Sequence, residues 1–178
     1  MKVGVLSDIH GEIDNLKKAL SNLQSIDCEI ICLGDLVSED SNTNDQCIEV
    51  IRNAKIKTVI GQHDETCIKV NCPPVINASR SFLESLPIFD ELDNIYIVHD
   101  NPLERGRQGL GMWSRGSYIK SSIEANVVFE DLETPQEKFQ FFLVGHTHVP
   151  KIFSSTDDEI NFEPNKPIQL SKESKYII

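Results

Sequence analysis

The sequence contains no apolar run long enough to cross a membrane. Its opening residues, Met1 to Leu6, lead straight into polar residues where a secretion signal would stay apolar. The sequence also has no CxxC pair, and its odd number of cysteines, five, argues against a disulfide framework. We therefore expect a cytoplasmic protein with reduced thiols and no membrane partner.

Positive charge is scarce as well. Lysine and arginine together number 17, against 28 aspartate and glutamate residues, so the net charge is -11. An acidic chain is not attracted over long distances to nucleic acid, and we expect no strong nucleic-acid binding. Clustered carboxylates suit hard cations instead.

Internal repeats and interdomain linkers are also absent, and a single domain is predicted over residues 1–178. Strands are predicted at residues 2–7, 29–33, 57–60, 95–98 and 139–144. Helices are predicted around residues 16–23, 48–51 and 82–86, the first with Asp14 or Asn15 as its cap. This alternation predicts an α/β fold, in which ligands bind beyond the carboxyl ends of the strands.

All the histidines of the chain lie just after predicted strands, at His10, His63, His99, His146 and His148. The same strand ends carry two carboxylates and an amide, Asp8, Asp35 and Gln62. Imidazole nitrogens bind transition metals, a carboxylate can bridge two ions, and an amide oxygen can complete a mixed shell. In an extended segment, Asp8 and His10 would point to the same side, as would His146 and His148. The pattern predicts a metal site.

The motifs follow a fixed order over nearly the whole chain: Asp8-x-His10, Gly34-Asp35, Gly61-Gln62-His63-Asp64, His99 and Gly145-His146-x-His148. This series resembles that of the calcineurin-like metallophosphoesterases. The resemblance implies a four-layer α/β/β/α sandwich, in which two mixed sheets are flanked by helices.

The resemblance also implies two divalent metal ions, manganese first, or else iron, zinc, nickel or magnesium. The first ion would be held by Asp8, His10, Asp35 and His148. The second would be held by Asp35, Gln62, His99 and His146. Asp35 would then bridge the two ions.

Two such ions lower the pKa of a shared water and align the hydroxide for in-line attack on phosphorus. His63 resembles the family histidine that donates a proton to the leaving oxygen, and Asp64 would either orient it or be a surface turn residue. The predicted activity is hydrolysis of phosphodiesters or phosphomonoesters. The alternative is a catalytically weak or inactive protein-binding module of the same fold.

Two features depart from the family pattern. Gln62 stands where the family usually has Asn, and its extra methylene shifts the amide oxygen, so we expect the second metal site to be the weaker one. Residues 175–178 read as the start of a strand, so the domain is either closed differently or shortened at its C-terminus. A shortened sheet would expose an edge, which a second copy in a homo-oligomer would cover.

Residues 36–40 lack the runs that mark protein phosphatases and dinucleoside polyphosphate hydrolases, so the chain resembles the small prokaryotic phosphodiesterase branch. Its substrate is expected to be a phosphorylated small molecule or nucleotide. Arg105, Arg107 and Arg115 would either bind phosphate or pair with acids such as Glu104. Trp113 would either stack a nucleobase or anchor its loop.

Overall fold

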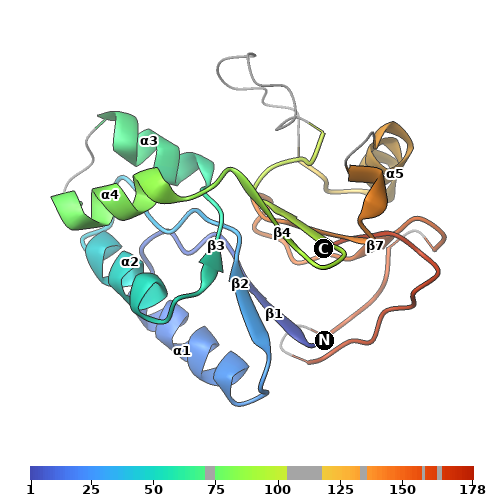
Figure 1. Ribbon diagram of the computed structural model, residues 1–178, viewed down its shortest axis with the longest axis horizontal. Coiled ribbons are helices and arrows are strands. Elements are labelled where there is room, and N and C mark those ends of the chain that lie inside the picture. Colours follow the sequence, from blue (N-terminus) through green and yellow to red (C-terminus); the bar gives the residue numbers. More distant parts are fainter. Residues whose placement is uncertain (71–74, 104–117, 133–135, 158, 164–165) are drawn as a thin grey trace. The chain divides into compact units, whose positions relative to one another are not determined.

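The computed structural model describes residues 1–70, 75–103, 118–132, 136–157, 159–163 and 166–178 (Figure 1). The chain divides into two compact units, Met1–Ile88 and Phe89–Ile178, and each unit has its own sheet. A single domain over residues 1–178 stays a prediction. Among the helices that are described, none has the length and apolar character of a membrane span.

The first unit contains a parallel sheet in the order β1 (Val3–Leu6), β2 (Glu29–Cys32) and β3 (Lys57–Thr58). Its helices are α1 (Ile13–Gln24), α2 (Asn44–Asn53), α3 (Gln62–Val70) and α4 (Asn77–Ser85). Leu16 and Leu20 of α1 join Ile48 and Ile51 of α2 in one buried apolar cluster that includes residues of the sheet. Burial of these helix faces holds the sheet and helices together.

The second unit contains a mixed sheet in the order β4-β5-β6-β8-β7. The strands are β4 (Phe89–Leu92), β5 (Ile95–Val98), β6 (Phe141–Val144), β7 (Phe153–Ser154) and β8 (Tyr176–Ile177). β5, β6 and β8 run parallel, whereas β4 and β7 pair antiparallel with β5 and β8. Helix α5 (Ser122–Asp131) packs Ala125 and Val128 into a second apolar cluster with Phe139 and Phe142. The 3-10 turn η1 (Gln136–Lys138) precedes β6.

The predicted α/β class, with two sheets flanked by helices, is confirmed. Several single elements differ from the prediction. Helix α1 begins before Asp14, which lies in its first turn, and its N-cap is Glu12 without a side-chain hydrogen bond. Helix α3 and strand β4 were not predicted because polar residues interrupt their apolar pattern. Strand β7 has only two residues, and the apolar residues of helix α5 do not gather on one face, so these elements were not predicted either. The strand predicted at residues 57–60 pairs only at Lys57 and Thr58.

The C-terminal residues form a strand, as their composition predicted. Tyr176 and Ile177 pair with β6 on one side and with β7 on the other. Of the two alternatives left open for this strand, the exposed edge is contradicted, because β7, which lies earlier in the chain, pairs with β8 on that side.

Candidate metal centre

The loops after β1 and β2 are joined by backbone hydrogen bonds that continue beyond the strands. Asp8 N donates to Gly34 O at 3.2 Å, and His10 N donates to Asp35 O at 2.9 Å. Three predicted ligands, Asp8, His10 and Asp35, therefore stand on adjacent, mutually braced loops at the carboxyl edge of the first sheet, the position expected for a ligand site in an α/β fold.

Asp35 is buried, with 1% of its surface exposed. Its Oδ1 accepts a hydrogen bond of 2.7 Å from His63 N, and its Oδ2 lies 3.9 Å from His10 Nε2. One ligand atom from each of His10, Asp35 and His63 lies within 4.8 Å of the others. In the first unit, two predicted ligands of a type that suits a divalent transition metal, His10 and Asp35, thus meet the predicted proton donor, His63, at one point.

Two glycines permit this close approach. Gly34 has φ +93°, and a Cβ there would lie 2.5 Å from Gly61 N. A Cβ on Gly61 would overlap Oδ1 and the backbone N of Asp35. The two loops approach too closely to leave room for a Cβ at either position, which explains why glycine precedes both Asp35 and Gln62.

His63, the third member of this cluster, lies in the first turn of α3. Its ring meets that of His10 edge to face, with 4.7 Å between centroids. Its Nδ1 lies 3.1 Å from Glu39 Oε2. Because a carboxylate accepts, Nδ1 is the nitrogen that carries the proton in this contact, and Nε2 remains for other chemistry. Glu39 was not predicted, since it stands in a polar stretch that forms no recognisable motif.

Asp64 is fully buried and accepts backbone hydrogen bonds from two segments. Its Oδ1 accepts from Leu36 N at 2.8 Å and from Val37 N at 3.2 Å, and its Oδ2 accepts from Gly61 N at 3.0 Å. This carboxylate fixes the loop after Asp35 to the start of α3. Its predicted role in orienting His63 stays a prediction, and Glu39 is the carboxylate in contact with the His63 ring.

Gln62 is the first residue of α3, directly before His63. It therefore belongs to the first unit, together with Asp8, His10 and Asp35. Its backbone carbonyl accepts a hydrogen bond from Thr66 Oγ1 at 2.9 Å.

The predicted ligands have an unusual backbone. Five of the seven have φ between 46° and 69°, namely Asp8, His10, Asp35, His146 and His148. The prediction that the Asp8/His10 and His146/His148 pairs lie in extended segments was therefore wrong. Left-handed backbone is uncommon for residues with a side chain and concentrates at ligand and active sites, so its occurrence here fits a binding role.

The second unit holds the remaining histidines at the carboxyl ends of β5 and β6. The strands pair in parallel register up to Val98 and Val144, and Gly145 N then donates to His99 O at 2.9 Å. The rings of His99 and His146 consequently lie side by side, with centroids 5.4 Å apart. His99 is fully buried, whereas His148, two residues after His146, is exposed.

Two further residues contact His146 that sequence reasoning did not single out. Tyr118 stacks on its ring, and Asp100 Oδ1 lies 3.8 Å from its Nδ1. Asp100 follows His99 directly, a signal that could have been used. Tyr118 has no local pattern that would point to it.

Two buried thiols, Cys32 and Cys47, are unsuited to catalysis. Burial raises the pKa of Cys32 to about 12 and that of Cys47 to about 11. Both groups stay protonated at neutral pH, and a protonated thiol is a poor nucleophile and metal ligand. The four described cysteines form no disulfide with one another.

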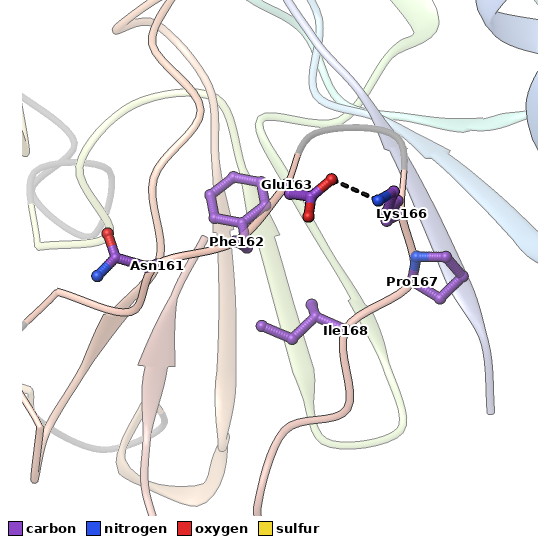
Figure 2. A pocket seen from close by; sticks show the side chains of 6 residues that line it. All are labelled: Asn161, Phe162, Glu163, Lys166, Pro167 and Ile168. Atoms are coloured by element: carbon purple, nitrogen blue, oxygen red, sulfur yellow. Dashed lines mark ion pairs between the residues drawn. The ribbon is translucent and has the colours of Figure 1, made fainter.

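The predicted arginine-rich loop, with Arg105, Arg107, Trp113 and Arg115, lies outside the described residues. Figure 2 shows a surface hollow in the second unit whose lining carries the Glu163–Lys166 ion pair. None of the predicted site residues lines this hollow, whose members are Asn161, Phe162, Glu163, Lys166, Pro167 and Ile168. It is therefore separate in sequence and composition from the motifs predicted to bind metal.

Comparison with known proteins gives a consistent result. A model of the calcineurin-like phosphoesterase superfamily domain matches residues 1–162. The uncharacterized protein MJ0912 of Methanocaldococcus jannaschii is 26% identical over 99% of this chain and 73% of its own length.

Two solved structures are similar to this chain. The crystal structure of a metallophosphoesterase from Sphaerobacter thermophilus has a TM-score of 0.77 and 25% identity, covering 99% of this chain and 74% of that one. A candidate diadenosine tetraphosphatase has a TM-score of 0.54 and 16% identity, covering 82% of this chain and 74% of that one, and it supports the fold alone. Because the matched model spans every motif from Asp8 to His148, the chain belongs to the calcineurin-like phosphoesterase superfamily.

Proposed function

We propose that this protein hydrolyses phosphodiesters or phosphomonoesters with the help of two divalent metal ions. Membership of the family supports phosphoester hydrolysis in general. The observation that carries the finer proposal is the cluster of His10, Asp35 and His63 around one point, with Asp35 buried at its centre. An imidazole–carboxylate cluster at a strand edge suits a hydrolytic metal centre.

We propose the ligand sets that the family resemblance implies. Asp8, His10, Asp35 and His148 would hold one ion, and Asp35, Gln62, His99 and His146 the other. Left-handed backbone at five of these positions and the donor chemistry of the set support this assignment. Bound ions of this kind activate water as the nucleophile and neutralise charge on the phosphoryl oxygens.

Among the residues of the protein, His63 would take the most direct part in catalysis. The Glu39 carboxylate holds Nδ1 of this ring at 3.1 Å and thereby directs Nε2 away from itself. With Nδ1 donating to Glu39, the ring can give a proton from Nε2 to a leaving alkoxide when it is the imidazolium, with both nitrogens protonated. We propose that His63 is the general acid, oriented by Glu39, while Asp64 maintains the backbone around both.

Turnover tests the proposal directly. Metal-free protein would be reloaded with manganese, nickel or zinc and assayed on paired chromogenic monoester and diester substrates. We expect metal-dependent hydrolysis that Asp35→Asn abolishes, because the bridging carboxylate is lost. Absence of metal-dependent turnover on both substrates would contradict the proposal and favour the alternative, a protein-binding module.

Substitution of His63 tests the general acid. We expect His63→Ala to retain manganese but to lose turnover by about 10²- to 10⁴-fold, the range for removal of a general acid. Glu39→Gln should give a smaller loss at unchanged metal content. Glu84→Gln, which alters a carboxylate paired with Arg80 on α4, is the matched control and should keep full activity. Unchanged turnover in metal-loaded His63→Ala would exclude the role.

Gln62 makes the second site the weaker one in this proposal, because its amide oxygen is displaced by a methylene relative to Asn. Calorimetric titration of the metal-free protein with manganese measures both sites. We expect two separable binding steps, and Gln62→Asn should tighten the weaker step. Two equally tight sites in the wild type would contradict the assignment.

A further inference from the structure

The imidazole of His146 is covered on one face by a tyrosine. Tyr118 and His146 stack with 4.4 Å between ring centroids and 3° between their planes. The rotation of a histidine ring about χ2 is soft, with broad wells. A parallel ring at this distance opposes that rotation, since turning the imidazole would drive its edge into the tyrosine face.

A carboxylate near the edge of the same imidazole influences which way the ring is turned. Asp100 Oδ1 lies 3.8 Å from His146 Nδ1, too far for a hydrogen bond but close enough for attraction. This contact favours the ring flip that turns Nδ1 toward Asp100 and leaves Nε2 on the opposite side. Tyr118 thus fixes the plane of the ring, and Asp100 selects between its two flips.

Tyr118 is itself held in place by the residues that follow it. The ammonium of Lys120 lies 4.0 Å from the Tyr118 ring centroid, a cation–π contact, and Ile119 is buried in the core. The backbone N of Lys120 donates to Glu124 Oε2 at 2.8 Å, which ties the segment to the first turn of α5. The stacking residue is therefore anchored at both its ring and its backbone.

We infer that Tyr118 is a positioning residue for His146, holding the imidazole in the orientation in which it binds the second metal ion. The inference rests on the proposed assignment of His146 as a ligand. Without the Tyr118 ring, the His146 imidazole rotates more freely about χ2. Metal binding then has to restrict this rotation, which lowers the affinity for the ion. Loss of groups that orient a ligand costs about 10- to 100-fold in metal affinity.

Calorimetric titration with manganese would compare wild type, Tyr118→Leu and Tyr118→Phe. We expect Tyr118→Leu to weaken the second equivalent about 10-fold or more and to leave the first unchanged, whereas Tyr118→Phe, which keeps the ring, stays close to wild type. A general loosening of the fold would weaken both equivalents. If Tyr118→Leu lowers the melting temperature, Tyr118→Met, which refills the volume without a ring, replaces it.

A metal-free measurement separates this inference from the proposed function. The ring protons of His146, assigned with His146→Gln, should show a ring-current shift in wild type and Tyr118→Phe that is lost in Tyr118→Leu. Unchanged His146 resonances in Tyr118→Leu would overturn the inference even if the protein bound no metal. The inference would also be overturned if Tyr118→Leu bound the second manganese equivalent as tightly as wild type does. The same holds if Tyr118→Phe weakened that equivalent as much as Tyr118→Leu does. A wild type that binds no manganese would instead refute the proposed function.

Discussion

Strain is concentrated on the residues predicted to bind metal. Eight non-glycine residues with positive φ are found in the described part of the chain, and five of them are predicted ligands. A side chain in this region costs about 1–2 kcal/mol, so the surrounding hydrogen bonds have to maintain it. The ladder of bonds between the loops after β1 and β2 does so for Asp8, His10 and Asp35.

Substitution of Asp64 tests whether hydrogen bonds maintain the backbone of these loops. Asp64→Asn replaces one acceptor oxygen by an NH₂ group, so at least one of the backbone N–H groups of Leu36, Val37 and Gly61 loses its partner in a buried place. We expect a loss of about 1–3 kcal/mol in the free energy of unfolding, measured by urea denaturation of the metal-free protein.

The matched control is Asp45→Asn, because Asp45 accepts from Ile76 N in an exposed position. Water can replace that bond, so its loss should be clearly smaller. Equal effects of the two substitutions would contradict a supporting role for Asp64.

At the scale of single residues, the candidate ligands could be predicted from the sequence, but the residues that contact and orient them could not. The histidines and Asp35 stand out in the sequence because each of them follows an apolar strand. Glu39 and Tyr118 do not, since one lies in a polar stretch and the other contacts His146 across 28 positions of sequence. Contacts of this kind depend on tertiary packing, which a local pattern does not encode.

Among the elements, α5 has the most clearly defined start. Ser121 Oγ accepts from Glu124 N, and the Glu124 carboxylate accepts from Ser121 N, which completes a capping box. Its apolar residues Ile123 and Val127 are exposed beside buried Ala125 and Val128, so the pattern has no clear face. The helix was missed for this reason, whereas the uniformly apolar β5 was predicted at Ile95–Val98, the bounds observed.

The capping box predicts a pH dependence. Hydrogen bonds from the backbone of Lys120 and the side chain of Ser121 lower the pKa of Glu124. A lowered folded-state pKa adds stability above the unfolded-state pKa, and this contribution disappears as pH falls through the folded-state pKa. The destabilisation caused by Glu124→Ala should thus be full at neutral pH and should shrink below about pH 4.

Urea denaturation at several pH values measures this effect. Glu130→Ala, near the other end of α5, serves as the control, because Glu130 is exposed and takes no part in the capping box. A difference between Glu124→Ala and wild type that stayed constant from neutral to acidic pH would contradict the assignment.

At the scale of the whole molecule, the predicted ligands are divided between the two units. Asp8, His10, Asp35 and Gln62 belong to the first unit, and the three other histidine ligands belong to the second. Each of these motifs follows a strand in the sheet of its own unit, a division that was not predicted from the sequence, for which a single domain was expected. Assembly of both sets around two ions is the central proposal, and it makes Asp35 the one residue shared by both ions.

Electron paramagnetic resonance of the manganese-loaded protein tests that proposal most directly. Two manganese ions that share the Asp35 carboxylate should give the spectrum of a spin-coupled pair, and Asp35→Asn should lose the coupling while Asp45→Asn keeps it. A wild-type spectrum of isolated, uncoupled ions at full metal loading would contradict a binuclear centre.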